Sequence, residues 1–330
     1  MFSLTQLWYA PRWYHWPIIV LLLPLTLLFA ILAKLRRLAF RLGLKVSSRA
    51  EVPVIIVGNI SVGGNGKTPM VVFLAQFLSE QGYQPGVLTR GYGGKSSQYP
   101  KAVTEHSIVT QVGDEPMLMR QHISCPLVVD PVRTRGAQFL VKECKCDVII
   151  CDDGLQHYAL KRDIEIVVID GKRRLGNGLL LPAGPLREGA WRLQQADFVV
   201  INGKTQAPSE YAMSLEAGDL INVKDPRLSR KVTSLVGPVT ALAGIGHPQR
   251  FFDLLASYPL EINKTISFVD HHQFSADDLP NDVLIMTEKD AVKCRDFAHQ
   301  DCWYLPVKAQ LSAAFSSEIL AKLRTINASN

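Results

Sequence analysis

One short stretch of the sequence, GNISVGGNGKTP at residues 58–69, has the composition of a phosphate-binding loop. Such loops curl backbone N–H groups around phosphate oxygens, and glycines serve where the chain takes positive φ or approaches the phosphates closely. Lys67 would reach the β- and γ-phosphates of a nucleotide, and the Thr68 hydroxyl would hold Mg²⁺. A purely structural glycine-rich turn is the alternative. The predicted nucleotide-binding residues are Ser61, Val62, Gly63, Gly64, Asn65, Gly66, Lys67 and Thr68.

Two adjacent carboxylates, Asp152 and Asp153, end the apolar run CDVIICDD. Acidic residues at the end of a buried strand, in the same domain as a P-loop, are typical of a Walker-B element, which positions Mg²⁺ or an attacking water. A divalent cation would also relieve the repulsion between neighbouring carboxylates. An Asp-Gly turn is the alternative. The predicted metal-binding residues are Thr68, Asp152 and Asp153.

A second acidic pair, Asp114 and Glu115, follows a glycine in QVGDEP, and His271 follows a predicted strand in DHH. If the parts of the chain that carry them face each other across a cleft, Asp114 and His271 could form a carboxylate–imidazole pair that deprotonates a hydroxyl group. A solvated acidic turn and a surface histidine pair are the alternatives. Sequence spacing alone does not decide between them.

Two further motifs contain charged residues near predicted strand ends. Arg187 and Glu188 lie in the Pro- and Gly-rich stretch LLPAGPLRE, and Arg suits bidentate phosphate contacts, although most loop arginines are solvated. The motif TEKD superficially resembles the guanine-reading motif of GTPases. Its order is wrong, because Lys289 directly precedes Asp290, so we reject guanine recognition.

The apolar pattern predicts the elements that position these residues. Continuous apolar runs, each followed directly by Gly or polar residues, alternate with segments of helical periodicity. This pattern is typical of a parallel sheet covered on both faces, whose ligands bind beyond the carboxyl ends of the strands. We predict a P-loop NTPase-like α/β/α sandwich with a second, smaller α/β domain. The predicted units are an N-terminal anchoring segment (1–50), a P-loop domain (51–205), a linker or hinge (206–238) and a C-terminal α/β domain (239–330).

The anchoring segment contains the uncharged apolar run Pro17–Ala33, which follows several Trp and Tyr residues. As a helix it would span roughly 26 Å, slightly short of a ~30 Å hydrocarbon core. The aromatic residues argue against a cleaved signal peptide, and the aromatic and basic flanks argue against a buried core helix. We predict a membrane anchor, spanning or partly inserted, with the rest of the chain on the cytoplasmic side by the positive-inside rule.

The distribution of charge argues against a nucleic-acid-binding protein. Residues 1–50 contain seven Lys and Arg and no acidic residue, whereas the whole chain has 36 Lys and Arg and 30 Asp and Glu. The remainder is therefore close to neutral, and a nucleic-acid binder would be expected to spread basic side chains over its folded domain. The basic residues concentrate beside the apolar segment, where they suit anionic lipid headgroups.

Taken together, the motifs resemble those of the tetraacyldisaccharide 4'-kinase family, the lipid A 4'-kinases of Gram-negative bacteria. The resemblance covers nearly the whole chain and rests on VGNISVGGNGKTP, LTRGYGG, VGDEP, DPVRTRG, CDDGLQH, LGNGLLLPAGPLRE, DHH and MTEKDAVKC in this order. It implies phosphorylation of the 4'-hydroxyl of a tetraacylated glucosamine disaccharide 1-phosphate, dependent on ATP and Mg²⁺, to give lipid IVA. It also implies two α/β/α domains joined by a β-stranded hinge, acting at the cytoplasmic face of the inner membrane.

The resemblance assigns roles to residues of this chain. Asp114 matches the family's proposed catalytic base and His271 its partner, while Asp152 and Asp153 match its Mg²⁺-associated acidic pair. The other positions that match active-site residues are Glu115, Gln156, His157, Arg187 and Glu188.

Two other functions fit the motifs less well. A membrane-tethered ATPase switch of the partitioning type carries a lysine where this chain has Val62, and it lacks an Asp–His pair from a second domain. A non-catalytic lipid-binding adaptor would have no use for Lys67 and Thr68 together with the acidic pair at residues 152–153. A lipid kinase is therefore the preferred interpretation.

Overall fold

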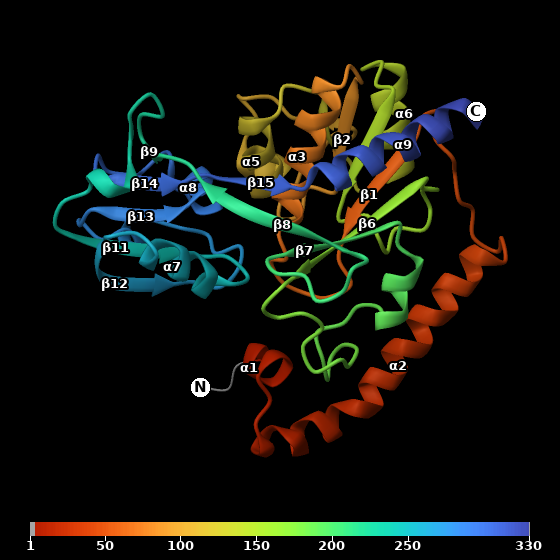
Figure 1. The fold of residues 1–330 in the computed structure, drawn as a ribbon, viewed down its shortest axis with the longest axis horizontal. Coiled ribbons are helices and arrows are strands. Elements are labelled where there is room, and N and C mark those ends of the chain that lie inside the picture. Colours follow the sequence, from red (N-terminus) through yellow and green to blue (C-terminus); the bar gives the residue numbers. More distant parts are fainter. Residues whose placement is uncertain (1–3, 330) are drawn as a thin grey trace.

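The computed structural model describes residues 4–329 and contains two sheets, one in each of two lobes (Figure 1). Within these residues the larger sheet has nine strands in the order β15-β8-β7-β6-β1-β5-β2-β4-β3. The strands from β8 to β4 run parallel to one another, and the two edge strands, β3 and β15, are antiparallel to their neighbours. Their bounds are β1 (Val54–Gly58), β2 (Pro85–Thr89), β3 (Lys101–Ala102), β4 (Leu127–Val129), β5 (Val148–Asp152), β6 (Ile164–Asp170), β7 (Phe198–Asn202), β8 (Glu210–Ala217) and β15 (Val307–Leu311).

Helices cover both faces of the larger sheet. Successive residues of a strand point to opposite faces, so Ile55 and Val57 join one apolar cluster while Val54 and Ile56 join another. The first cluster includes residues of helices α3, α5 and α9, and the second includes residues of α6. This arrangement confirms the predicted α/β/α sandwich. The helices of this lobe are α3 (Lys67–Glu80), α4 (Val109–Val112), α5 (Asp114–His122), α6 (Arg133–Lys142) and α9 (Ala313–Ser329).

The smaller sheet has six strands among the described residues, in the order β10-β9-β14-β13-β11-β12. Phe251 and Leu255 of α7 pack in one of its two apolar clusters, and Ala291 and Cys294 of α8 pack in the other. Its elements are β9 (Leu220–Asn222), β10 (Ser229–Arg230), β11 (Pro238–Ala243), α7 (Pro248–Ala256), β12 (Glu261–Ser267), β13 (Leu284–Thr287), α8 (Glu288–Cys294) and β14 (Cys302–Leu305). Short 3-10 helices occur at Trp13–His15, Ala190–Gln195, Val232–Ser234 and Ala276–Asp278.

Two antiparallel strands connect the lobes. β8 leads from the larger sheet towards the smaller one and β15 returns, with Val307 opposite Ala217 (Figure 1). The structure departs here from the predicted division, which placed all of 239–330 in the C-terminal domain. β15 pairs with β8 of the larger sheet, and the side chains of Phe315, Ile319 and Leu323 on α9 are fully buried in its core.

The N-terminal segment forms α1 (Leu4–Tyr9) and the long helix α2 (Trp16–Arg41). Residues Trp13–Arg41 make one helix that is long and apolar enough to cross a membrane by length and composition, and only 11% of its apolar window is buried. A core helix would be mostly buried, so the alternative of a buried core helix does not fit. α2 nevertheless touches the larger lobe, because the Thr26 hydroxyl accepts a hydrogen bond from the backbone N–H of Ala183 at 3.1 Å. It lies alongside that lobe in Figure 1.

Candidate functional site

The predicted phosphate-binding loop connects β1 to the start of α3 at Lys67. Gly63 and Gly66 have φ of +105° and +95°, a region that side chains disfavour. At Gly66 a side chain is also excluded by packing, because an added Cβ would lie 2.4 Å from Nδ2 of Asn202. The loop therefore leads into a helix N-terminus, whose free N–H groups and dipole favour a phosphate.

Ser61 and Val62, at the start of the loop, do not line the cavity described below. Ser61 is buried, and its hydroxyl accepts a hydrogen bond from Nδ2 of Asn65 at 2.9 Å. The backbone carbonyl of Val62 accepts a hydrogen bond from the Tyr9 hydroxyl at 2.9 Å. The Ser61 side chain and the Val62 carbonyl therefore make contacts that hold the loop in place, whereas residues 63–68 line the cavity.

The two carboxylates at the end of β5 have different surroundings. Asp152 is buried; its Oδ2 accepts a hydrogen bond from the Thr89 hydroxyl at 3.3 Å, and its Oδ1 has no hydrogen-bond partner among the described residues. Burial, together with the nearby carboxylate of Glu115, raises the pKa of Asp152 to about 7. An unpaired buried carboxylate oxygen facing a second carboxylate, with Thr68 on the same cavity, suits a divalent cation.

The described residues contain no group of three or more His, Cys, Asp or Glu that could hold a metal ion unaided. Mg²⁺ in nucleotide sites is bound through one or two carboxylates and substrate phosphates, with several waters retained. The donor set of Thr68 and Asp152 fits that kind of site.

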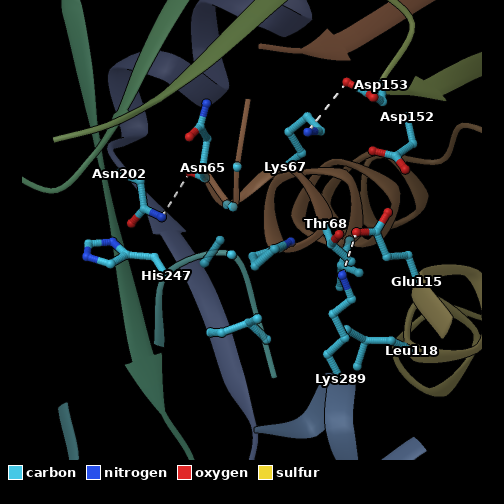
Figure 2. Close-up of a pocket in the computed structure, with 18 of the residues that line it drawn as sticks. Asn65, Lys67, Thr68, Glu115, Leu118, Asp152, Asp153, Asn202, His247 and Lys289 are labelled. Carbon is cyan, nitrogen blue, oxygen red and sulfur yellow. Dashed lines mark hydrogen bonds and ion pairs between the residues drawn. The ribbon is translucent and has the colours of Figure 1, made fainter. Parts of the chain in front are cut away.

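Asp153 is held instead by two cations. Its carboxylate lies 3.4 Å from Nζ of Lys67 and 3.2 Å from Nη1 of Arg187. Although burial raises the pKa of Asp153, Lys67 and Arg187 outweigh this effect and lower it. Lys67, at the start of α3, and Arg187, in a loop, thus both line the cavity (Lys67 in Figure 2).

Asp114 and His271 meet, although 157 residues separate them in the chain. Asp114 begins α5 of the larger lobe, and His271 follows β12 of the smaller lobe. Nδ1 of His271 lies 3.0 Å from Oδ2 of Asp114, while the other oxygen of Asp114 accepts the backbone N–H of Glu115 at 2.9 Å. Asp114 is buried and does not line the cavity, whereas His271 does.

The hydrogen bond sets the ionisation of both groups. Burial raises the pKa of Asp114, but the contacts with His271 and Lys289 more than offset this and lower it. The Asp114 carboxylate stabilises the imidazolium form and raises the pKa of His271. His271 also has a φ of +61°, a conformation that costs energy for a non-glycine residue and is frequent at functional sites.

Lys289 is a site residue that the sequence reasoning missed. It lies in the first turn of α8, and its ammonium is 3.1 Å from Oε1 of Glu115, 3.3 Å from Oδ1 of Asp270 and 3.4 Å from Nε2 of His271. Figure 2 shows the contact with Glu115, which joins the two lobes. The signal was present in TEKD, at the end of a predicted strand, but the motif was tested there only for guanine recognition and for the family resemblance, and no site role was predicted for Lys289.

Gln156 and Glu188 form a connected pair beside the loop. Nε2 of Gln156 donates to Oε2 of Glu188 and to the backbone carbonyl of Asn59, both at 3.1 Å, and the Tyr158 hydroxyl donates to Oε1 of Glu188. The two residues fasten the segments after β5 and before the 3-10 helix at 190–195 to the start of the P-loop. Both residues also line the cavity.

His157 faces the same cavity in strongly basic surroundings. Burial, together with the nearby guanidinium groups of Arg133, Arg162, Arg36 and Arg90, lowers the pKa of His157 to about 4. The imidazole is therefore neutral at neutral pH, and the positive potential here suits an anionic ligand. Of these arginines, Arg36, Arg90 and Arg133 also line the cavity, and the sequence analysis had not singled them out.

These groups surround one cavity of about 1760 Å³ between the two lobes and α2. Its wall includes the phosphate-binding loop, the ring of His271 and four residues of the apolar helix, which are Phe29, Leu32, Ala33 and Arg36. It extends over residues of β8, β15 and α7 as well. The glycine-rich loop, the imidazole that contacts Asp114 and part of the apolar helix thus open into the same space.

Comparison with known proteins gives one consistent result. Residues 18–324 match the model of the family described as tetraacyldisaccharide-1-P 4'-kinase (LpxK). The chain is 60% identical over 304 residues to the tetraacyldisaccharide 4'-kinase of Pseudoalteromonas atlantica, covering 92% of this chain and all of that relative. It is 50% identical over 327 residues to the enzyme of the same name from Tolumonas auensis, covering 98% of each.

A solved structure shares the fold. LpxK from Aquifex aeolicus, crystallised in complex with ATP, superposes with a TM-score of 0.78 at 28% identity, covering 93% of this chain and 99% of that one.

Proposed function

The chain belongs to the tetraacyldisaccharide-1-P 4'-kinase family, and on this basis we propose that it transfers the γ-phosphate of ATP to the 4'-hydroxyl of a tetraacyldisaccharide 1-phosphate, giving lipid IVA. The observation that carries the proposal is the shared cavity. A phosphate-binding loop, the imidazole of His271 and an apolar helix face line one space, which is what a kinase for a lipid-linked sugar requires.

In this mechanism the backbone N–H groups of residues 63–68 would hold the phosphates of ATP, and the ammonium of Lys67 would neutralise charge on them. Phosphoryl transfer depends mainly on positioning and on neutralising charge. Arg187 contributes a second cation, because Asp153 holds both side chains in place.

Asp114 and His271 act as the base for the 4'-hydroxyl. The buried Asp114 accepts the Nδ1 proton of His271 and orients the ring, and the ring faces the cavity where the hydroxyl would lie. The pair titrates as a unit, so the proton taken from the hydroxyl belongs to the dyad. Lys289 fixes the smaller lobe against Glu115 and helps to lower the pKa of Asp114.

We propose Mg²⁺ as the metal ion and Thr68 and Asp152 as the residues that hold it, with Glu115 beside them. When bound, Mg²⁺ would neutralise charge on the phosphate oxygens of ATP. Burial and the nearby Glu115 disfavour the ionised form of Asp152 and so raise its pKa. A bound cation would stabilise that ionised form.

The apolar helix brings the enzyme to its lipid substrate. A tetraacylated lipid leaves a bilayer with difficulty, at about 0.8 kcal/mol for each buried CH₂. One face of α2 contacts the larger lobe through Ile19 and Thr26 and the cavity through Phe29 and Ala33. A helix crossing the bilayer by itself would not have such a face, so we propose that α2 lies partly inserted in the cytoplasmic leaflet of the inner membrane.

We further propose that the two lobes move relative to each other about β8 and β15. Because Asp114 and His271 come from different lobes, opening the lobes would separate the dyad and closing them would assemble it.

The test is transfer of ³²P from [γ-³²P]ATP to tetraacyldisaccharide 1-phosphate in mixed micelles, detected by thin-layer chromatography. The wild-type chain should form a labelled lipid, and the Lys67→Ala and Asp114→Ala variants should not. ATP hydrolysis without a labelled lipid would contradict the proposal and favour an ATPase switch.

A further inference from the structure

A second set of contacts joins the lobes, on the side of the phosphate-binding loop away from Lys289 (Asn202 and His247 in Figure 2). Arg250 of α7, in the smaller lobe, reaches two residues of the larger lobe. Its Nη1 lies 3.1 Å from Oδ2 of Asp170, and its Nη2 lies 2.8 Å from the backbone carbonyl and 2.6 Å from Oδ1 of Asn202. The Arg250 guanidinium therefore binds residues at the carboxyl ends of two neighbouring strands, β6 and β7.

Asn202, which Arg250 contacts, also hydrogen-bonds to the phosphate-binding loop. Its Nδ2 donates to the backbone carbonyl of Asn65 at 3.1 Å, and the same nitrogen lies against the Cα of Gly66 so closely that no Cβ would fit there. Because Arg250 occupies the amide oxygen, the amide nitrogen must point at the loop. The loop conformation at residues 65–66 is thus supported by a residue that the other lobe orients.

The buried carboxylate of Asp170 makes the contact between the lobes depend on the charge of Arg250. It is 2% exposed, and its Oδ1 accepts the backbone N–H groups of Lys172 and Arg173, each at 2.9 Å. Its Oδ2 lies 3.1 Å from Nη1 of Arg250 and 3.4 Å from Nδ1 of His247, both in the smaller lobe. Separating the lobes would take the Arg250 cation away from a buried carboxylate, which is costly.

The backbone of the smaller lobe also touches the loop directly. An added Cβ at Gly246 would lie 2.8 Å from the backbone nitrogen of Gly64, and the carbonyl of Gly246 accepts Nη1 of Arg173 at 2.9 Å. The segment between β11 and α7 is therefore seated on the phosphate-binding loop.

We propose that Arg250 is a positioning residue that couples docking of the smaller lobe to the conformation of the phosphate-binding loop, acting through Asn202. The inference rests on the proposed function. Arg250 follows β11 and His271 follows β12, and these strands are neighbours in one sheet. The docking that brings His271 to Asp114 is thus the docking that brings Arg250 to Asn202.

The experiment is a double-mutant cycle on the full-length chain. Steady-state kinetics with ATP and tetraacyldisaccharide 1-phosphate are measured for wild type, Arg250→Ala, Asn202→Ala and the double variant. Each single variant should raise KM for ATP about tenfold, since a buried hydrogen bond to a charged group is lost or left unsupported. The double variant should be no worse than Arg250→Ala, because the contribution of Asn202 depends on Arg250.

Two further variants separate coupling from a general loss of packing. Lys172→Ala removes an ion pair across the same gap, Lys172 to Asp253 at 2.6 Å, whose side chains are 70% and 44% exposed. An exposed pair contributes little, so KM for ATP should change less than about twofold. Arg250→Lys can keep the pair with Asp170 but not both bonds to Asn202, so KM for ATP should stay raised. Thermal unfolding shows whether each variant is folded.

Multiplicative effects of Arg250→Ala and Asn202→Ala on KM, or an unchanged KM in either, would overturn the inference. The same cycle is measured on ADP affinity by calorimetry, which requires no turnover. If the wild-type chain labels no lipid, the proposed function fails, while the ADP cycle still decides the role of Arg250.

Discussion

Replacing Asp114 with Asn tests the dyad while preserving its shape. Asn has nearly the same shape, and its single amide oxygen can still accept one of the two N–H groups, from Glu115 or from His271, that now contact the two oxygens of Asp114 at 2.9 and 3.0 Å. It carries no charge, and its amide nitrogen cannot accept the other N–H group. Asp114 is 5% exposed, so water cannot screen or replace the lost charge. We expect kcat to fall about 10²- to 10⁴-fold, the usual contribution of a positioned general base. KM for ATP should stay within about threefold, because Asp114 does not line the cavity.

The pH dependence gives a second, independent measure of the same substitution. In the wild type the Asp114 carboxylate raises the pKa of His271, so the rate should fall as pH drops through a value above the ordinary 6.5 of histidine. Without that charge the imidazolium is less stable and still faces the ammonium of Lys289. The pKa of His271 then falls, and the acid limb of the kcat profile should move to lower pH.

Asp270→Asn is the matched control. Asp270 lies 3.9 Å from Nε2 of His271 and its side chain is 36% exposed, so solvent screens its charge and kcat should change less than about fivefold. The assay is initial-rate ³²P transfer between pH 5.5 and 9, as for wild type. Near-wild-type kcat with an unmoved acid limb in Asp114→Asn would refute the dyad. Loss of ATP binding in the same variant would show that Asp114 acts only in folding.

Other substitutions probe the remaining parts of the site. Lys67→Ala should reduce kcat/KM about 100-fold or more, by analogy with the loss of one preorganised electrostatic contact; near-normal transfer would exclude Lys67 from phosphate binding. Gly66→Ala should lower the free energy of unfolding by about 1–3 kcal/mol and weaken ADP binding, because of its φ of +95° and the 2.4 Å approach to Asn202; denaturant unfolding and calorimetry measure the two effects. Leu32→Asp, on the cavity side of α2, should raise KM for the lipid several-fold but leave KM for ATP unchanged, since only the acyl chains need an apolar wall; equal changes in both would argue against a lipid-binding role. Lys289→Met should lower kcat about tenfold by leaving Asp114, Glu115 and Asp270 without their shared cation; single-turnover rates at saturating ATP test it.

Much of the larger lobe could be predicted because its information is local. The runs at residues 52–57, 146–153 and 164–170 are mostly apolar and end in, or are followed by, Gly or acidic residues, and each overlaps an observed strand. The phosphate-binding loop is read equally well, because strand, glycines and helix start follow each other directly in the chain.

The parts that could not be predicted depend on long-range packing. The periodicity of α9 predicts a helix but not the sheet that it covers, so the return of β15 to the larger lobe was not foreseen. The Asp114–His271 contact spans 157 residues; the residue types suggested the pair, but sequence spacing could not show that the two side chains meet, and only the family resemblance paired them. Asn202 and Arg250 carry no motif, because their importance arises only where two strand ends meet another lobe.

The way in which the N-terminal helices contact the cavity bears on protein engineering. Deleting an apolar N-terminal segment is a common route to a soluble enzyme. Here the deletion would remove Phe29, Leu32 and Ala33 from the wall of the cavity. It would also remove the hydrogen bond from the Tyr9 hydroxyl to the carbonyl of Val62. Solubility is better sought on the outward side of α2. Leu21 and Leu28, two turns apart, are 77% and 52% exposed, and polar residues at these positions would leave the wall of the cavity unchanged.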